Sequence, residues 1–280
     1  MWQEKAIVFS CEGELLSGVL HMAAKSNGRS MLMLAGGPQY RVGHARKSVM
    51  FAREMAASGT SVLRFDHRGT GDSSGPYLTF QQVEKDLAAA LDELTHHVLE
   101  TRQICVFGLG DAASSALMFS SYDARVTELI LLNPRVKSDV EEINHTEESY
   151  FGKRPFSAAY WQNLLFGMDR VSSYVSEIVS KVTFSRKPAA AGSSNSARVS
   201  KDFRVRMRLG AEQFNGRVLL LQSGQDTEFQ DFVAASRRWT QCVDGWTHQS
   251  VSDLGPGSAD AGWKNQLVKC SREWMEQGPV

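Results

Sequence analysis

The sequence predicts an α/β fold in which helices cover both faces of a mostly parallel sheet, and three observations predict it. Short apolar, β-rich runs alternate with segments of helical spacing, and strands separated by such helices form parallel pairs. With 280 residues, 42% of them hydrophobic, the chain is long enough for one large core with an insertion. The alternation stops at Pro134 and resumes at Arg217, which divides the core into residues 1–133 and 217–280.

The first half of the chain contains six expected strands. The first two are joined by the turn Glu12-Gly13 and form an antiparallel hairpin at a sheet edge. The third is an apolar run that ends in a Gly-Gly-Pro loop. The strands are expected at Ala6–Ser10, Leu15–Met22, Ser30–Ala35, Ser61–Asp66, Gln103–Phe107 and Glu128–Asn133. Apolar residues at helical spacing predict helices at His44–Ser58, Phe80–Val98 and Asp111–Ser120.

Residues 134–216 are polar, helical and aromatic, without a strand pattern, so we expect a helical cap inserted into the core. Within it, Arg186–Ser200 is rich in Ala, Ser and Gly and is expected to be mobile. The alternation then resumes with two strands and two helices. They are expected at Arg217–Ser223, Glu228–Thr240, Trp246–Leu254 and Trp263–Met275.

Composition excludes several classes of function. Thirty-one basic and thirty-one acidic residues give no net charge, so we expect no nucleic-acid partner. The four cysteines lie far apart without a C-x-x-C pair, so we expect neither a metal site nor a disulfide framework, and no cofactor. The N-terminus has no apolar signal core, and no apolar run approaches the length of a membrane span. A cytoplasmic protein is the default expectation.

Three segments between strands and helices carry the candidate chemistry. Gly108-Leu109-Gly110-Asp111-Ala112 fits the turn that presents a nucleophile in α/β-hydrolases, with small residues on both sides. The nucleophile position then falls on Gly110, although an ordinary Gly-containing turn is an equal alternative. In Arg64–Ser73, glycines permit a turn across which Asp66 can pair with Arg68, and His67 is interpreted as a turn residue. Ser223–Asp226 follows a strand, where the acid of a hydrolase triad occurs.

Over nearly its whole length the chain resembles the exosortase A system-associated hydrolases of type 1, which are bacterial α/β-hydrolases. The resemblance is most specific in Gly36–Gly43, Val62–Gly75, Gly108–Leu117 and Leu131–Val136. It implies a Cys at the position of Gly110 and an A-D-H-x-F motif after the last strand. Aligning that motif with Ala259-Asp260 puts Ala261 at the histidine position. The resemblance therefore implies that nucleophile and base are both lost, while the acid Asp226 is retained.

No other residue makes a convincing replacement for the triad. Ser114 and Ser115 lie one turn into the helix and are expected to pack, as is Cys105 inside its strand. His248 is expected at the wrong end of the sheet, and His96 and His97 at an exposed helix end.

The apparatus for binding an oxyanion is expected to persist. The N–H of Asp111 starts the elbow helix, and a second donor is expected from the Gly37–Tyr40 loop, with Gln39 the better candidate because Pro38 has no N–H. His44 is a candidate for the pocket mouth. Aromatic residues of the insertion, Tyr160 and Trp161 among them, are candidates to roof an apolar pocket, although packing within the insertion is an equal alternative.

The leading hypothesis is a pseudoenzyme that binds a small acyl-type or hydrophobic ligand, or a protein partner, without hydrolysing it. One alternative is an active enzyme: an esterase or thioesterase, or a lyase or cyclase working through acid–base chemistry at Asp111 or Asp226. A third hypothesis is a purely structural scaffold subunit.

Overall fold

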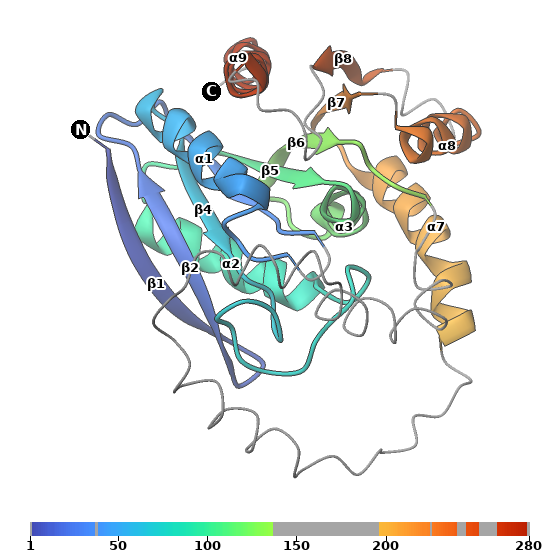
Figure 1. Cartoon of the computed structure of the whole chain (residues 1–280), viewed down its shortest axis with the longest axis horizontal. Helices are drawn as coiled ribbons and strands as arrows, with labels where there is room; N and C mark the ends of the chain where they lie inside the picture. Colours follow the sequence, from blue (N-terminus) through green and yellow to red (C-terminus); the bar gives the residue numbers. More distant parts are fainter. Residues whose placement is uncertain are drawn as a thin grey trace, which may run out of the picture. The chain divides into compact units, whose positions relative to one another are not determined.

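The computed structural model describes residues 2–36, 39–136, 196–224, 226–239, 245–251 and 262–278. Its strands form one eight-stranded sheet in the order β1-β2-β4-β3-β5-β6-β7-β8 (Figure 1). The first two strands form an antiparallel hairpin, β2 pairs antiparallel with β4, and every later pair is parallel. The strands are β1 Gln3–Cys11, β2 Glu14–Met22, β3 Arg29–Met33, β4 Ser61–Phe65, β5 Gln103–Leu109, β6 Val126–Leu132, β7 Arg217–Ser223 and β8 Thr247–Val251. The predicted α/β class and the edge hairpin are confirmed.

Two apolar cores lie on opposite faces of the sheet, because successive side chains of a strand point to opposite faces. In β4, Leu63 and Phe65 belong to the core beneath α2, α3, α7 and α8, whereas Val62 belongs to the core beneath α1 and α9. Figure 1 shows these helices on their two sides of the strands. The α-helices are α1 Lys47–Ala57, α2 Glu84–His97, α3 Asp111–Phe119, α7 Ser196–Gln213, α8 Thr227–Ser236 and α9 Gly262–Glu276.

The chain divides into two compact units, one of Met1–Lys137 with Phe203–Val280 and one of Ser138–Asp202. Our predicted cap, residues 134–216, falls largely outside the described residues and stays a prediction. Of the segment Arg186–Ser200, only the end is described, and it begins helix α7. The later turns of α7 bury Phe203, Met207 and Ala211 in the core of the first unit.

Within the described ranges, no helix is both long and apolar enough to cross a membrane. The same ranges contain no cluster of three or more His, Cys, Asp or Glu side chains able to hold a metal ion.

Candidate functional site

The turn between β5 and α3 is a sharp elbow with Gly110 at its apex. Gly110 has φ 60° and ψ −121°, a conformation that side chains other than hydrogen disfavour. Two residues earlier, a Cβ on Gly108 would lie 2.5 Å from the backbone carbonyl of Ala112, so only glycine fits there. Strand and helix therefore approach as closely as a nucleophile elbow requires.

The space above Gly110 is open enough for a side chain. A Cβ built there would meet Arg135 first, at 3.6 Å from its Nε, which is ordinary van der Waals contact. The Arg135 guanidinium in turn lies 2.5 Å from Glu228 Oε2, in an ion pair about one-third exposed. The sequence analysis did not predict this pair. The sequence pointed only to Arg135, which lies in Leu131–Val136, one of the segments that carry the family resemblance. A charged pair thus lies next to the apex of the elbow.

Asp226 lies after β7, two strands away from the elbow strand, and its carboxylate is engaged in local structure. Oδ1 accepts hydrogen bonds from the N–H groups of Glu228, at 2.9 Å, and Phe229, at 3.4 Å, so Asp226 is the N-cap of α8. Oδ2 accepts a hydrogen bond of 3.0 Å from Nδ2 of Asn133. Asn133 also bonds to both the N–H and the carbonyl of Ser223, so it links the ends of β6 and β7. The candidate acid is held by two neighbouring elements.

The loop after β3 passes against the elbow. A Cβ on Gly36 would lie 3.0 Å from the carbonyl oxygen of Leu109 and 3.4 Å from the nitrogen of Ala112. The Gln39 N–H, which we expect to help bind an oxyanion, donates instead to the Gly36 carbonyl at 3.2 Å. In this structure that donor is used within its own loop. Gly37 lies outside the described residues.

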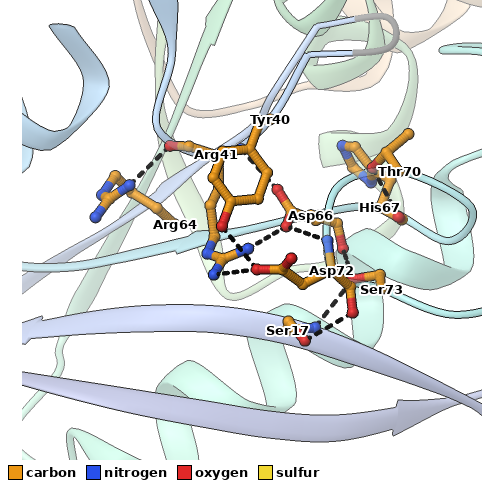
Figure 2. A network of polar contacts seen from close by, with 9 residues as sticks. All are labelled: Ser17, Tyr40, Arg41, Arg64, Asp66, His67, Thr70, Asp72 and Ser73. Atoms are coloured by element: carbon orange, nitrogen blue, oxygen red, sulfur yellow. Dashed lines mark hydrogen bonds and ion pairs between the residues drawn. The ribbon is translucent and has the colours of Figure 1, made fainter. Parts of the chain in front are cut away.

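A network of polar contacts centred on Asp66 holds this loop in place (Figure 2). The buried Asp66 carboxylate pairs with the Arg41 guanidinium and accepts the N–H groups of Arg41, at 2.6 Å, and Asp72, at 3.0 Å. Arg41 also pairs with Asp72 at 2.7 Å, and the Tyr40 hydroxyl donates to the same carboxylate at 2.6 Å. Hydrogen bonds from Tyr40 and Arg41 hold the pKa of Asp72 below its usual range. The network joins the loop after β3 to the turn after β4.

The predicted pairing of Asp66 with Arg68 is therefore wrong. The Arg68 side chain reaches Asp86 of α2, with Nε 2.5 Å from Oδ1, because the turn points it away from Asp66. His67 lies on the same side, buried, with its Nδ1 3.6 Å from Asp86. His67 is a turn residue, as we expected.

The hydroxyls near the elbow are engaged in packing. Ser114 Oγ donates to the Arg135 carbonyl at 2.7 Å, and Ser115 Oγ donates to the Phe80 carbonyl at 2.7 Å. Cys105 is fully buried within β5, where burial raises the pKa of its thiol well above the usual value. These three residues have the packing roles that the sequence predicts.

The remaining candidates are not brought together. Asp111 is the first residue of α3 and lies beside the apex. His44 is exposed and does not line the small cavity that opens beneath the loop after β3. Tyr160, Trp161 and Ala261 lie outside the described residues.

Comparisons with known proteins agree with this architecture. A family model described as "Serine aminopeptidase, S33" matches residues 40–230. Among solved structures, the Pyrococcus furiosus esterase Pf2001 has a TM-score of 0.60 at 17% identity, covering 98% of this chain and 92% of that one. Est1E from Butyrivibrio proteoclasticus, with bound ferulic acid, has a TM-score of 0.62 at 16% identity, covering 97% and 98%. A thermostable carboxyl esterase from Bacillus coagulans has a TM-score of 0.62 at 11% identity, covering 99% of both chains. No curated protein matches. At these identities the similar structures share the fold.

Proposed function

The chain belongs to the serine aminopeptidase S33 family of α/β-hydrolases, and we propose that it is a pseudoenzyme of that family, which binds an acyl-type ligand without hydrolysing it. The observation that carries the proposal is Gly110 at the apex of the elbow, in the strained conformation of a nucleophile but without a side chain. A covalent mechanism needs a hydroxyl or thiol at that point, with a base beside it.

The described neighbours offer no substitute for the nucleophile. The hydroxyls of Ser114 and Ser115 donate to backbone carbonyls. The resemblance to exosortase A system-associated hydrolases of type 1 adds Ala261 as a vacated histidine position. The loss of the nucleophile and the loss of the histidine are consistent with each other, because one triad member contributes little to the rate once the other has gone. Retention of Asp226 needs no catalytic explanation, since the residue caps α8 and holds Asn133.

The ligand class follows from the surroundings of the elbow. Leu109 and Tyr40 are 42% and 40% exposed and line the same small cavity, which provides apolar surface beside the apex. We place an acyl chain on this surface, and its carbonyl near the first turn of α3 and Asp111, because a helix N-terminus attracts a polarised oxygen. Tyr160 and Trp161 of the predicted cap lie outside the described residues, and with the exposed His44 they stay sequence-based candidates for contact with such a ligand. A cytoplasmic bacterial protein fits this proposal.

Restoring the missing groups tests the proposal. Wild-type protein and Gly110→Ser alone are expected to hydrolyse p-nitrophenyl acyl esters and acyl thioesters no faster than buffer, because the introduced serine lacks a base. Gly110→Ser combined with Ala261→His is expected to give measurable turnover, since the family resemblance puts the triad histidine at position 261 and Asp226 at the acid position. Saturable turnover by the wild-type protein would favour the alternative of an active esterase or thioesterase.

A ligand screen separates ligand binding from the scaffold hypothesis. Acyl and aromatic compounds are expected to raise the melting temperature of the wild-type protein, because a ligand that binds the folded state stabilises it. A broad screen without any shift would contradict ligand binding and favour a structural or partner-binding role.

A further inference from the structure

A small cavity of about 40 Å³ lies beneath the loop after β3, where the carboxyl ends of β3, β4 and β5 meet α1. Its apolar wall includes Met33, Phe107 and Leu109, and its polar lining includes Arg64 and Ser48. One water molecule needs about 10–15 Å³ of such space, so the cavity is large enough for a group of about three non-hydrogen atoms.

Arg64 is a buried cation without a carboxylate in contact. It is 4% exposed; its Nε donates to His21 Nε2 at 3.0 Å, and its Nη1 donates to the Arg41 carbonyl at 2.7 Å. A guanidinium has five N–H donors. Two are therefore used, and in the part of the chain that the structure describes the other three have no protein partner.

Two carboxylates, Glu4 and Asp66, act on Arg64 without contacting it, and each of them pairs with another arginine. Asp66 pairs with Arg41, and Glu4 pairs with Arg53 at 2.8 Å. His21 provides no negative charge, because it accepts a hydrogen bond from Arg64 as a neutral ring, and burial lowers its pKa to about 4. Burial likewise lowers the pKa of Arg64 to about 10, because removing the guanidinium from water disfavours its charged form.

We propose that this cavity binds a single carboxylate group, with Arg64 as its counter-ion and the Ser48 hydroxyl as a second donor. A planar, singly charged carboxylate matches the two-pronged edge of one guanidinium, whereas a phosphate dianion needs more charge and more room. Ser48 lies in the first turn of α1, whose N-terminal end also favours a negative group.

The inference goes beyond the proposed function, because a carboxylate site beside the elbow does not depend on whether the protein hydrolyses esters. The carboxylate belongs either to a small free acid or to a longer acid. In the second case the chain leaves the cavity over Leu109, which lines the cavity and is 42% exposed.

Titration calorimetry on the full chain tests the inference, with sodium acetate, sodium octanoate and neutral acetamide at constant chloride. Acetate is expected to bind at least about tenfold more tightly than acetamide, because only the anion gains the charge-assisted bonds. Octanoate binding as acetate does indicates a small free acid, and octanoate binding more tightly indicates a longer acid; both support the site. Equal binding of acetate and acetamide, or no binding of acetate, would overturn it.

Variants assign the site to Arg64. Arg64→Met is expected to weaken acetate binding about tenfold or more. The matched control is Arg125→Met, because Arg125 pairs with Asp123 and does not line the cavity. This variant is expected to leave acetate binding unchanged. Equal weakening in both variants would contradict the assignment. If Arg64→Met does not fold, the comparison of acetate with acetamide on the wild-type protein still decides.

Discussion

At the scale of single residues, the energetic role of Gly110 is open to direct measurement. Because a Cβ there meets only van der Waals contacts, Gly110→Ser costs conformational strain and little else. We expect a loss of about 1–3 kcal/mol in the free energy of unfolding, measured with urea. Gly245→Ser is the matched control, since a Cβ there meets nothing within 4 Å and the backbone is not left-handed. A neutral or stabilising Gly110→Ser would make Gly110 an ordinary turn glycine.

Also at this scale, His21 makes stability depend on pH. Burial lowers its pKa from the ordinary value of 6.5 to about 4. Below pH 6.5 the unfolded chain binds a proton at this residue and the folded chain does not, so stability falls as the pH drops towards 4. The slope from this one group is at most about 1.4 kcal/mol per pH unit.

The variant His21→Gln isolates that contribution, because glutamine keeps an acceptor for Arg64 but does not titrate. We expect the stability difference between wild type and variant to shrink steadily from pH 7 to pH 4.5 in urea unfolding. Parallel stability curves over that range would show that His21 is not the titrating group.

At the scale of elements, the Asp66 network fixes the loop after β3 to the turn after β4. Asp66→Asn removes a buried charge opposite Arg41, and we expect a loss of about 3 kcal/mol in the free energy of unfolding. Asp72→Asn is the matched control: Asp72 also pairs with Arg41 but is 57% exposed, so we expect a much smaller loss. Similar losses for both variants would mean that the network is no more than surface pairing.

The elements themselves could be predicted from the sequence, whereas their contacts could not. The strands and the glycine turn at Gly108–Ala112 are visible as local patterns in the sequence, and each is found near its expected position in the structure. Arg41, the cation that pairs with Asp66, lies 25 residues back in a loop with no periodic pattern, so the nearer Arg68 was chosen wrongly. The expected helix from His44 also begins later, at Lys47, because Ala45 and Arg46 have positive φ, which no pattern indicates.

At the scale of the whole molecule, a hydrolase fold holds its site residues where the carboxyl ends of its parallel strands meet. Gly110 follows β5 and Asp226 follows β7, so the sheet order places both positions at that edge. The alternation of elements in the sequence predicted a mostly parallel sheet, but not its strand order. It did not predict the Arg135–Glu228 pair beside the apex either, because the two residues lie far apart in the chain.

The central claim is that a hydrolase scaffold has kept its elbow and lost its nucleophile. The most direct measurement treats the wild-type chain with a fluorophosphonate and an iodoacetamide probe, followed by mass spectrometry of the peptide that spans Gln103–Leu117. The account predicts no adduct on this peptide at any residue other than Cys105, because Gly110 has nothing to react and the hydroxyls of Ser114 and Ser115 are engaged. An adduct at another residue of the peptide would contradict it.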